Sequence, residues 1–295
     1  MGLVTTPEER FDDLSNYPYE PQYVDVGGPE MAYIDEGSGE ETVLCLHGEP
    51  TWGYLYRKMV PTLTDVGRVV VPDFVGFGRS AKYTDPEEYS FEMHYESLVA
   101  FVEALDLDDI TLVCQDWGGI LGLSVAGHYP ERFARLVPMN TGIPSGTQEM
   151  PAEWEEFREF VERADDLPIG MLIQNATATR LTEETLAAYE APFPSAEYEV
   201  GARTWPDMVP RKGGGEGAET TRAAAERLAE WEKPAFVLFG DSDPITRGNR
   251  DPLRELIPAA SEQPDVWVED AMHFLQEDAG AETAERIVDF VRRTQ

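Results

Sequence analysis

Short apolar runs alternate with helix-like patterns through most of this chain. The runs that are rich in β-branched residues and short enough for buried strands are 42–46, 68–71, 110–114 and 135–139. Between them, residues 91–105 and 118–129 carry apolar side chains at helical spacing. Such an alternation predicts an α/β fold, with a mostly parallel central sheet that is flanked by helices.

The alternation is interrupted between residues 145 and 232. In this stretch the pattern predicts an acidic helix over 152–163, two shorter helices within 167–189 and a further helix over 218–231. Long insertions that have secondary structure of their own are usually functional lids. We therefore expect residues 145–232 to form a helical cap domain.

Strand-like runs return after the insertion, at 235–239 and 266–268, and an amphipathic helix over 282–292 closes the chain. These elements complete the α/β pattern of the first part. We therefore expect residues 1–144 and 233–295 to fold together as one core domain.

The centre of the chain carries a carboxylate where a strand must turn sharply into a helix. The stretch reads Gln115-Asp116-Trp117-Gly118-Gly119 and follows the apolar run 110–114. Hydrolases of the α/β-hydrolase fold place a nucleophile on such a turn, usually in the pattern Gly-x-Ser-x-Gly. A carboxylate can displace a leaving group from a saturated carbon and leave an alkyl-enzyme ester. The alternative is that Asp116 only caps the helix that follows.

Two later residues complete a catalytic set in the chain order typical of this fold, which is nucleophile, acid and base. Asp243 follows the apolar run 235–239, and His273 follows 266–268. In this interpretation Asp116 attacks, and His273, oriented by Asp243, deprotonates the water that hydrolyses the ester. A loop further upstream, after the run 42–46, is expected to help form the oxyanion hole.

Two backbone N–H groups, those of Glu49 and Trp117, are the candidates for this oxyanion hole. The Trp117 indole N–H is a donor without acceptor capacity, so it could also hold a leaving halide. The alternative for Trp117 is core packing, the usual place of a tryptophan. We interpret His47 as shaping its loop, because a histidine followed by glycine at a strand end more often does so than acts in catalysis. We interpret His94 as a surface or packing residue, because it has no acidic or Cys partner at metal-ligand spacing. No metal site or cofactor is expected.

The charge of the chain excludes some partners. With 57 Asp and Glu against 23 Lys and Arg, the net charge is −34, which repels nucleic acid and anionic membranes. The acids are spread along the chain, as in the archaeal-like acidic proteins of salt-loving microbes. A Debye length of about 3 Å at molar salt would screen their repulsion. We therefore predict a halophilic protein.

Targeting signals and cysteine usage indicate the compartment. The first residues lack the basic start and apolar stretch of a signal peptide, and no apolar run approaches the ~20 residues of a membrane helix. The two cysteines, Cys45 and Cys114, both fall within apolar runs, which predicts no disulfide framework. We expect a cytoplasmic protein in a high-salt cell. Whether the chain forms a homo-oligomer stays open.

Several segments make the chain similar to the haloalkane dehalogenases, over nearly its whole length. These segments are 47–59, 72–78, 115–119, 191–194 and 273–277. The resemblance implies hydrolysis of small apolar haloalkanes by water to alcohol, halide and a proton, without cofactor or metal. Glu49 in the His-Gly-Glu-Pro loop and an acid at 243 resemble the subgroup that takes its second halide donor from a cap tryptophan.

The chain departs from that subgroup at the second halide donor. The donor usually lies in a Trp-x-x-Phe pattern some ten residues before a Leu-Pro pair, which here is Leu167-Pro168. The matching position is Phe157, with Phe160 completing the pattern, and Phe157 cannot donate a hydrogen bond. Trp154 lies one helical turn earlier. Either Trp154 takes over the role, or halide is held less well.

Two other functions stay open. An epoxide hydrolase uses the same Asp-His-Asp relay and needs cap tyrosines, for which Tyr189 and Tyr198 are available. A protein of this fold could also bind a small apolar ligand without turnover. The Glu49-Pro50 loop favours a dehalogenase over the first alternative, and the intact set of Asp116, Asp243 and His273 counts against the second.

Overall fold

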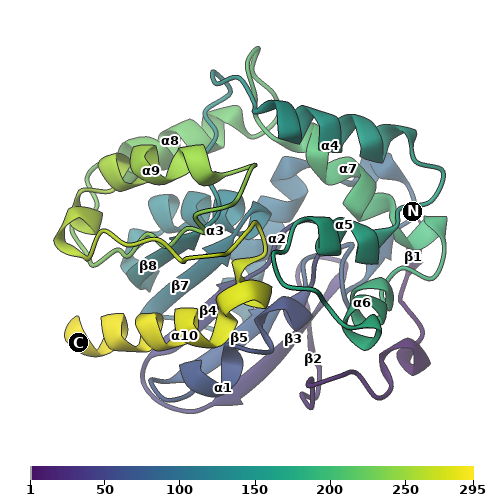
Figure 1. The fold of residues 1–295 in the computed structure, drawn as a ribbon, viewed down its shortest axis with the longest axis horizontal. Helices are drawn as coiled ribbons and strands as arrows, with labels where there is room; N and C mark the ends of the chain where they lie inside the picture. Colours follow the sequence, from purple (N-terminus) through teal and green to yellow (C-terminus); the bar gives the residue numbers. More distant parts are fainter. Residues whose placement is uncertain (1) are drawn as a thin grey trace.

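The computed structural model describes residues 2–295, and a six-stranded sheet lies at its centre (Figure 1). Its strand order is β2-β3-β5-β4-β7-β8, with β3 antiparallel to β2 and β5 and the remaining neighbours parallel. β1 and β6 form a separate antiparallel pair. The strands are β1 (Leu3–Val4), β2 (Gln22–Asp25), β3 (Glu30–Gly37), β4 (Thr42–Leu46), β5 (Arg68–Pro72), β6 (Lys82–Tyr83), β7 (Ile110–Gln115) and β8 (Phe133–Met139). The mostly parallel sheet is the one that the sequence predicts.

Beyond β8 the sheet continues less regularly than expected. The segments 235–239 and 266–268 lie at the predicted places, but they pair through single bridges and not through full ladders. Leu136 bridges Ala235, Met139 bridges Leu238, and Gly240 bridges Val268, all in parallel. The prediction of two regular strands here is therefore wrong, although both segments extend the sheet in the expected direction.

Helices flank the sheet and form the predicted insertion. The core helices are α1 (Val60–Leu63), α2 (Phe91–Ala104), α3 (Trp117–His128), α8 (Ala218–Leu228), α9 (Arg250–Leu256) and α10 (Leu275–Arg293). The insertion contains α4 (Ala152–Arg163), α5 (Ile169–Asn175), α6 (Glu183–Glu190) and α7 (Val200–Met208), which lie together at one end of the molecule (Figure 1). α10 begins seven residues before the predicted start at 282.

α8 lies within the range 145–232 that the sequence assigns to the cap, but it packs on the core. It runs beside α3 (Figure 1), and a Cβ placed on Gly127 of α3 would lie 2.8 Å from the Cα of Ala224 in α8. Only a glycine allows two helices to approach this closely. By its packing α8 therefore belongs with the core layer, and the cap helices end with α7.

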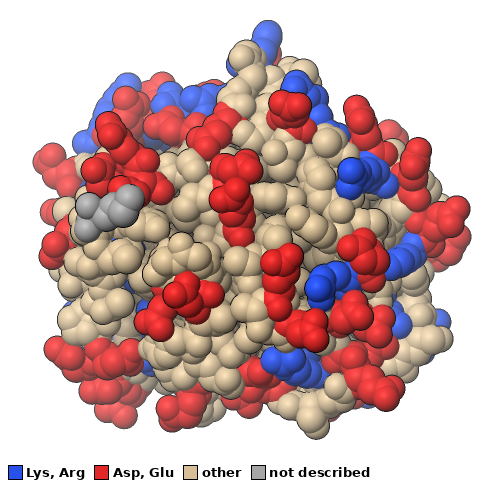
Figure 2. Space-filling view, turned by 180° about the vertical axis from the view of Figure 1, so that it is seen from behind, with Lys and Arg blue, Asp and Glu red and all other residues tan. Residues whose placement is uncertain are grey.

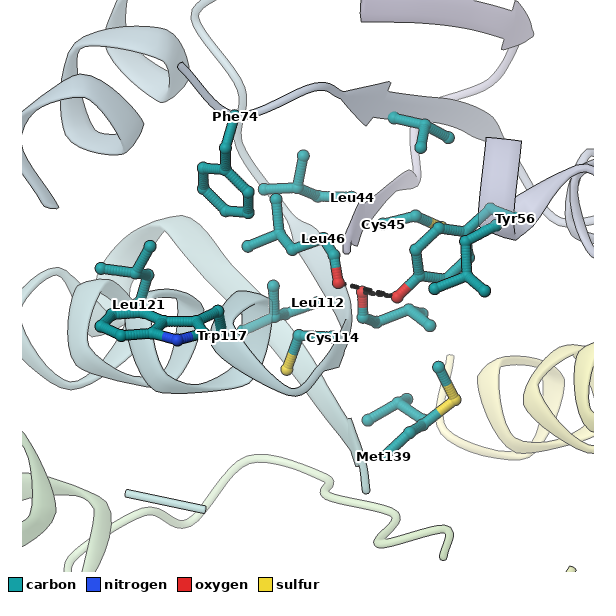
Figure 3. Close-up of a cluster of buried hydrophobic side chains, with 14 of the residues drawn as sticks. Leu44, Cys45, Leu46, Tyr56, Phe74, Leu112, Cys114, Trp117, Leu121 and Met139 are labelled. Atoms are coloured by element: carbon teal, nitrogen blue, oxygen red, sulfur yellow. Dashed lines mark hydrogen bonds between the residues drawn. The ribbon is translucent and has the colours of Figure 1, made fainter. Parts of the chain in front are cut away.

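The interior is built around β4 and β7, whose residues are buried along their whole length. Figure 3 shows leucines of both strands packed with Leu121 of α3 and Met139 of β8. Tyr56 joins this cluster and donates its hydroxyl to the Leu46 carbonyl at 2.8 Å (Figure 3). Strands that are covered on both faces read as continuous apolar runs, which is why the sequence predicts them well.

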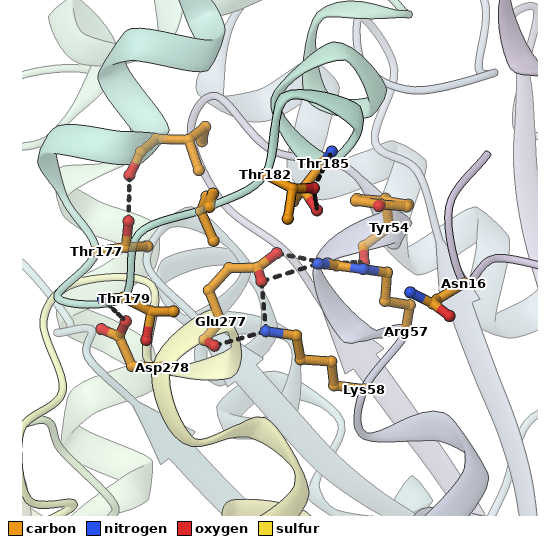
Figure 4. A network of polar contacts seen from close by, with 12 residues as sticks. Asn16, Tyr54, Arg57, Lys58, Thr177, Thr179, Thr182, Thr185, Glu277 and Asp278 are labelled. Carbon is orange, nitrogen blue, oxygen red and sulfur yellow. Dashed lines mark hydrogen bonds and ion pairs between the residues drawn. The ribbon is translucent and has the colours of Figure 1, made fainter.

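A buried polar network joins core and cap (Figure 4). Glu277, near the start of α10, accepts hydrogen bonds from Arg57 at 2.9 Å and from the hydroxyl of Tyr189 in α6. Burial by itself raises the pKa of Glu277, but the Arg57 guanidinium and the neighbouring Lys58 hold it below its usual value. Removing one partner of a buried ion pair such as Arg57 and Glu277 costs about 3–5 kcal/mol, so the network holds the cap in place on the core.

Acidic side chains cover much of the surface. On the face shown in Figure 2, Asp and Glu are spread over the whole outline and outnumber the basic residues. In residues 2–295 no helix is both long enough and apolar enough to cross a membrane. Cys45 and Cys114 are free thiols in the core, and burial raises the pKa of both.

Candidate active site

Asp116 stands on a strained turn between β7 and α3. Its backbone has φ +51° and ψ −124°, and its side chain makes no capping hydrogen bond to α3. Two close approaches permit the turn: a Cβ on Gly118 would lie 2.3 Å from the Leu46 carbonyl, and one on Gly48 would lie 2.3 Å from Asp116 Oδ1. The geometry is that of a nucleophile elbow and speaks against a purely capping role.

The structure brings together the three residues that the sequence places in the catalytic set. His273 Nε2 lies 3.5 Å from Asp116 Oδ2, and His273 Nδ1 lies 3.1 Å from Asp243 Oδ2. The backbone N–H of Glu49 donates to Asp116 Oδ1 at 2.8 Å. The backbone N–H of Trp117 makes no such bond to a group in residues 2–295, which leaves it free for an oxyanion.

The two carboxylates control the charge of the imidazole. Burial disfavours the protonated ring, but Asp243 and Asp116 together raise the pKa of His273 to about 10. Burial likewise opposes ionisation of Asp243, yet the charge of His273 and hydrogen bonds from His273, Thr246 and the Ile245 backbone hold its pKa below the usual value. Both carboxylates therefore favour the protonated form of the His273 ring.

Sequence reasoning assigned no role to two residues that hold His273 in place. The Gln115 side-chain amide donates to the His273 backbone carbonyl at 3.3 Å, and the Asn140 side-chain amide donates to the same carbonyl at 2.9 Å. The side-chain oxygen Oδ1 of Asn140 accepts the Gly240 N–H at 2.9 Å, so the Asn140 side chain connects the loops of Asp243 and His273. Both residues sit at strand ends, Gln115 as the last residue of β7 and Asn140 directly after β8, and that position is the signal that could have identified them.

Burial shifts the pKa of two ionisable groups near the nucleophile toward their neutral forms. Burial, and then the charge of Asp116, raise the pKa of Glu49 well above its ordinary value, and neither of its carboxyl oxygens has a partner in residues 2–295. Burial lowers the pKa of His47 to about 4, and its Nε2 accepts the Phe74 N–H at 3.0 Å. His47 thus shapes its loop, as the sequence indicates, and the raised pKa of Glu49 disfavours a second negative charge beside Asp116.

A cavity of about 980 Å³ opens above these residues. Asp116, Trp117 and His273 line it from the core, and Trp154 and Phe157 line it from α4 of the cap. The indole N–H of Trp117 donates to no group in the described chain, so it is free to bind an anion in the cavity. Because an indole is a donor only, it suits a halide leaving group.

A second tryptophan, which sequence reasoning did not single out, supports Trp117. Trp205 of α7 stacks on Trp117 with ring centroids 5.1 Å apart and planes 28° apart. The Trp205 indole N–H donates to His94 Nε2 at 2.6 Å, and burial lowers the pKa of His94 to about 3. His94 is thus a buried packing residue that fixes Trp205, and the Trp205 N–H is not available to a halide.

Comparison with known proteins identifies the chain. A sequence profile described as "alpha/beta hydrolase fold" matches residues 41–279. A haloalkane dehalogenase from Psychrobacter cryohalolentis is 39% identical over 99% of this chain and 98% of that protein, and one from Mycolicibacterium paratuberculosis is 41% identical over 98% of each. The chain belongs to the haloalkane dehalogenase family.

A solved dehalogenase shares the structure as well as the sequence. The tetrameric structure of haloalkane dehalogenase DpaA from Paraglaciecola agarilytica matches with a TM-score of 0.90 and 40% identity, covering 97% of both chains. The dehalogenase DatA from Agrobacterium tumefaciens, at 23% identity and a TM-score of 0.82, shares the fold. The predicted α/β-hydrolase fold and the predicted family are both confirmed.

The structure removes the support for an epoxide hydrolase. Tyr189 is fully buried and donates its hydroxyl to Glu277, and neither Tyr189 nor Tyr198 lines the cavity. No tyrosine hydroxyl among residues 2–295 therefore faces Asp116 across the cavity to protonate an epoxide oxygen. The dehalogenase names of the relatives agree with this geometry.

The sequence predicts a second halide donor on the cap, and two aromatic residues of α4 lie near the expected place. Phe157 occupies the expected position on α4, lines the cavity and has no N–H to offer. Trp154 lies one turn earlier, is 7% exposed and also lines the cavity, with the Arg211 guanidinium 5.6 Å from its ring centroid. Trp154 is therefore the cap residue that can supply a second N–H.

Proposed function

We propose that this dehalogenase hydrolyses haloalkanes to alcohol, halide and a proton through an ester on Asp116. One observation carries the proposal: a carboxylate on a nucleophile elbow accepts the Glu49 N–H and contacts His273 at the floor of a largely apolar cavity. A carboxylate in this position can attack saturated carbon, and the histidine beside it can activate water.

The first step needs a nucleophile and a halide acceptor but no base. Asp116 attacks the halogen-bearing carbon, the carbon–halogen bond breaks, and its electron pair leaves with the halide. The Trp117 indole N–H stabilises the halide as its charge develops. Trp154 is our candidate for a second donor; without it the halide is held by Trp117 alone.

The second step needs the base. Once Asp116 is an ester, its negative charge no longer raises the pKa of His273, so the ring gives up its proton more readily. Neutral His273, oriented by Asp243, then takes a proton from a water that attacks the ester carbonyl carbon. The backbone N–H groups of Glu49 and Trp117 hold the oxyanion. The bond between the carbonyl carbon and the alkyl oxygen breaks, and the alcohol leaves with one proton of the water. The other water proton returns His273 to its protonated starting form, so the proton that His273 gave up before the attack is the one released, and the Asp116 carboxylate returns.

The test is halide release from 1-bromobutane and 1,2-dibromoethane by the wild type beside Asp116→Ala and the isosteric Asp116→Asn. We expect release by the wild type and none above background from either variant, while circular dichroism shows that both are folded. Release that persists in folded Asp116→Ala would exclude Asp116 as nucleophile. Turnover of styrene oxide without any halide release would favour an epoxide hydrolase.

We further propose that the enzyme works in the cytoplasm of a high-salt cell. The net charge of −34 and the spread of acids over the surface support this environment, because salt screens their repulsion (Figure 2). Two free buried cysteines suit a reducing compartment. The relative from Paraglaciecola agarilytica is described as tetrameric, and we propose that this chain also forms a homo-oligomer, which light scattering would test.

A further inference from the structure

The cavity is much larger than a short haloalkane requires. Its volume of about 980 Å³ lies at the upper end of the roughly 300–1,000 Å³ that is typical of pockets for drug-sized ligands. A four-carbon bromide has about five heavy atoms, or roughly 150 Å³ if each takes the ~30 Å³ of one water. Such a substrate would leave most of the space beside Asp116 to water.

The reactive groups take up only a small part of the cavity wall. Asp116, Trp117 and His273 form the reactive end, whereas the remaining wall is mainly apolar. The apolar side chains of this wall come from the cap and its end, and from α9 and the loop before it. They are Phe157, Leu172, Val209, Ile245, Leu253 and Leu256. A halogen is needed only at the reactive end, so the rest of the wall fits plain hydrocarbon.

The apolar wall continues to the surface. Phe160 of α4 and Met171 of α5 both line the cavity, and their exposed fractions are 39% and 48%. The only other large hydrophobic residues in residues 2–295 with comparable exposure are Leu3 and Tyr23, which lie outside the cavity. Apolar side chains exposed at the mouth of an apolar cavity mark a place where a ligand enters or protrudes.

Acidic residues also line the cavity near its opening. Glu149, Glu153 and Glu156 are all exposed members of its lining. A substrate with an anionic tail, such as a halogenated fatty acid, would meet like charges there in addition to the net charge of −34. These residues disfavour an anionic tail, and the apolar side chains that also line the cavity favour a tail without charge.

We infer that the preferred substrates are long-chain terminal haloalkanes, of about eight or more carbons, with an uncharged tail that runs from Trp117 along the apolar wall to Phe160 and Met171. The inference rests on the proposed dehalogenase function and adds the substrate class to it. Each methylene that enters the wall leaves water, which should raise kcat/KM by about two- to fourfold per carbon.

The test compares 1-bromobutane, 1-bromohexane, 1-bromooctane and 1-bromodecane, each below its solubility limit, with bromide measured in potassium glutamate. We expect kcat/KM to rise along the series, and 10-bromodecanol to be a better substrate than 10-bromodecanoate. Values that are flat or that fall beyond four carbons would overturn the inference while leaving the dehalogenase function intact. No bromide from any member would instead refute the proposed function.

Two variants locate the tail. Met171→Glu puts a charge at the mouth, and its matched control Leu3→Glu puts the same charge on a residue of similar exposure, 46%, outside the cavity. We expect Met171→Glu to lower kcat/KM for 1-bromodecane at least fivefold relative to that for 1-bromobutane, and Leu3→Glu to leave this ratio as in the wild type. Leu256→Trp, which fills the wall, should act like Met171→Glu. Equal effects of either cavity variant on both substrates would overturn the proposed path.

Discussion

Replacing His273 with glutamine should separate the two chemical steps. The attack by Asp116 needs no base, and in His273→Gln the Glu49 N–H and the Trp117 indole stay in place. Hydrolysis of the ester does need a base, and losing it slows a reaction by about 10²- to 10⁴-fold, or roughly 3–5 kcal/mol. The variant should therefore release halide once and then stall as the alkyl-enzyme.

The buried Asp243 does not lose all its partners in this variant. It still accepts the Ile245 N–H at 2.9 Å and a hydrogen bond from the Thr246 hydroxyl, so we expect His273→Gln to fold. Unfolding followed by circular dichroism is the control for this assumption.

The assay is rapid-quench bromide release from 1-bromobutane combined with intact-protein mass spectrometry. We expect a burst of one bromide per active site, then a rate reduced by about 10²- to 10⁴-fold, and a mass increase of one butyl group on the peptide that contains Asp116. Asp116→Ala should show neither burst nor adduct. Steady turnover of His273→Gln at the wild-type rate would refute the division of roles between Asp116 and His273, as would a folded variant with no burst and no adduct.

Two further predictions concern halide and salt. Phe157→Trp should tighten chloride binding about tenfold or more, because one added hydrogen bond from an N–H to an anion contributes roughly 1.5–3 kcal/mol. Trp154→Phe should weaken chloride binding by a similar factor. Quenching of tryptophan fluorescence by chloride measures both, and unchanged chloride affinity in Trp154→Phe would leave Trp117 as the sole donor. The urea midpoint of unfolding should rise between 0.1 and 2 M KCl with an unchanged m-value, since screening relieves the repulsion of a net charge of −34, and equal midpoints would contradict the high-salt proposal.

The core and the catalytic set could be predicted because their signals are local. β4, β7 and β8 are buried on both faces, so each reads as an unbroken apolar run, and parallel strands present their carboxyl ends at one edge of the sheet. Asp116 follows one such run directly. Asp243 and His273 follow runs that pair only through bridges, yet those runs still deliver both residues to the same edge.

Elements that depend on distant partners could not be predicted. α10 starts at Leu275 and not at 282 because its first turn is held by contacts from elsewhere in the chain, among them Arg57 on Glu277. Nothing within a short window of sequence indicates that pairing. Tyr189 shows the same limit: its helix was expected, but only the fold reveals that its hydroxyl turns to Glu277 and away from the cavity.

The position of Trp117, the proposed halide donor, depends on the packing of the cap. Trp117 belongs to the core helix α3, but one face of its ring is packed against Trp205 of the cap helix α7. Trp205 is fixed in turn by its hydrogen bond to His94 of the core helix α2, with both side chains fully buried. Trp205 of the cap therefore lies between two core residues, Trp117 and His94. Trp117 keeps this contact only while the cap is packed on the core. If Asp116 and Trp117 have the roles that we propose, the nucleophile is positioned by the core, whereas the halide donor depends on both core and cap.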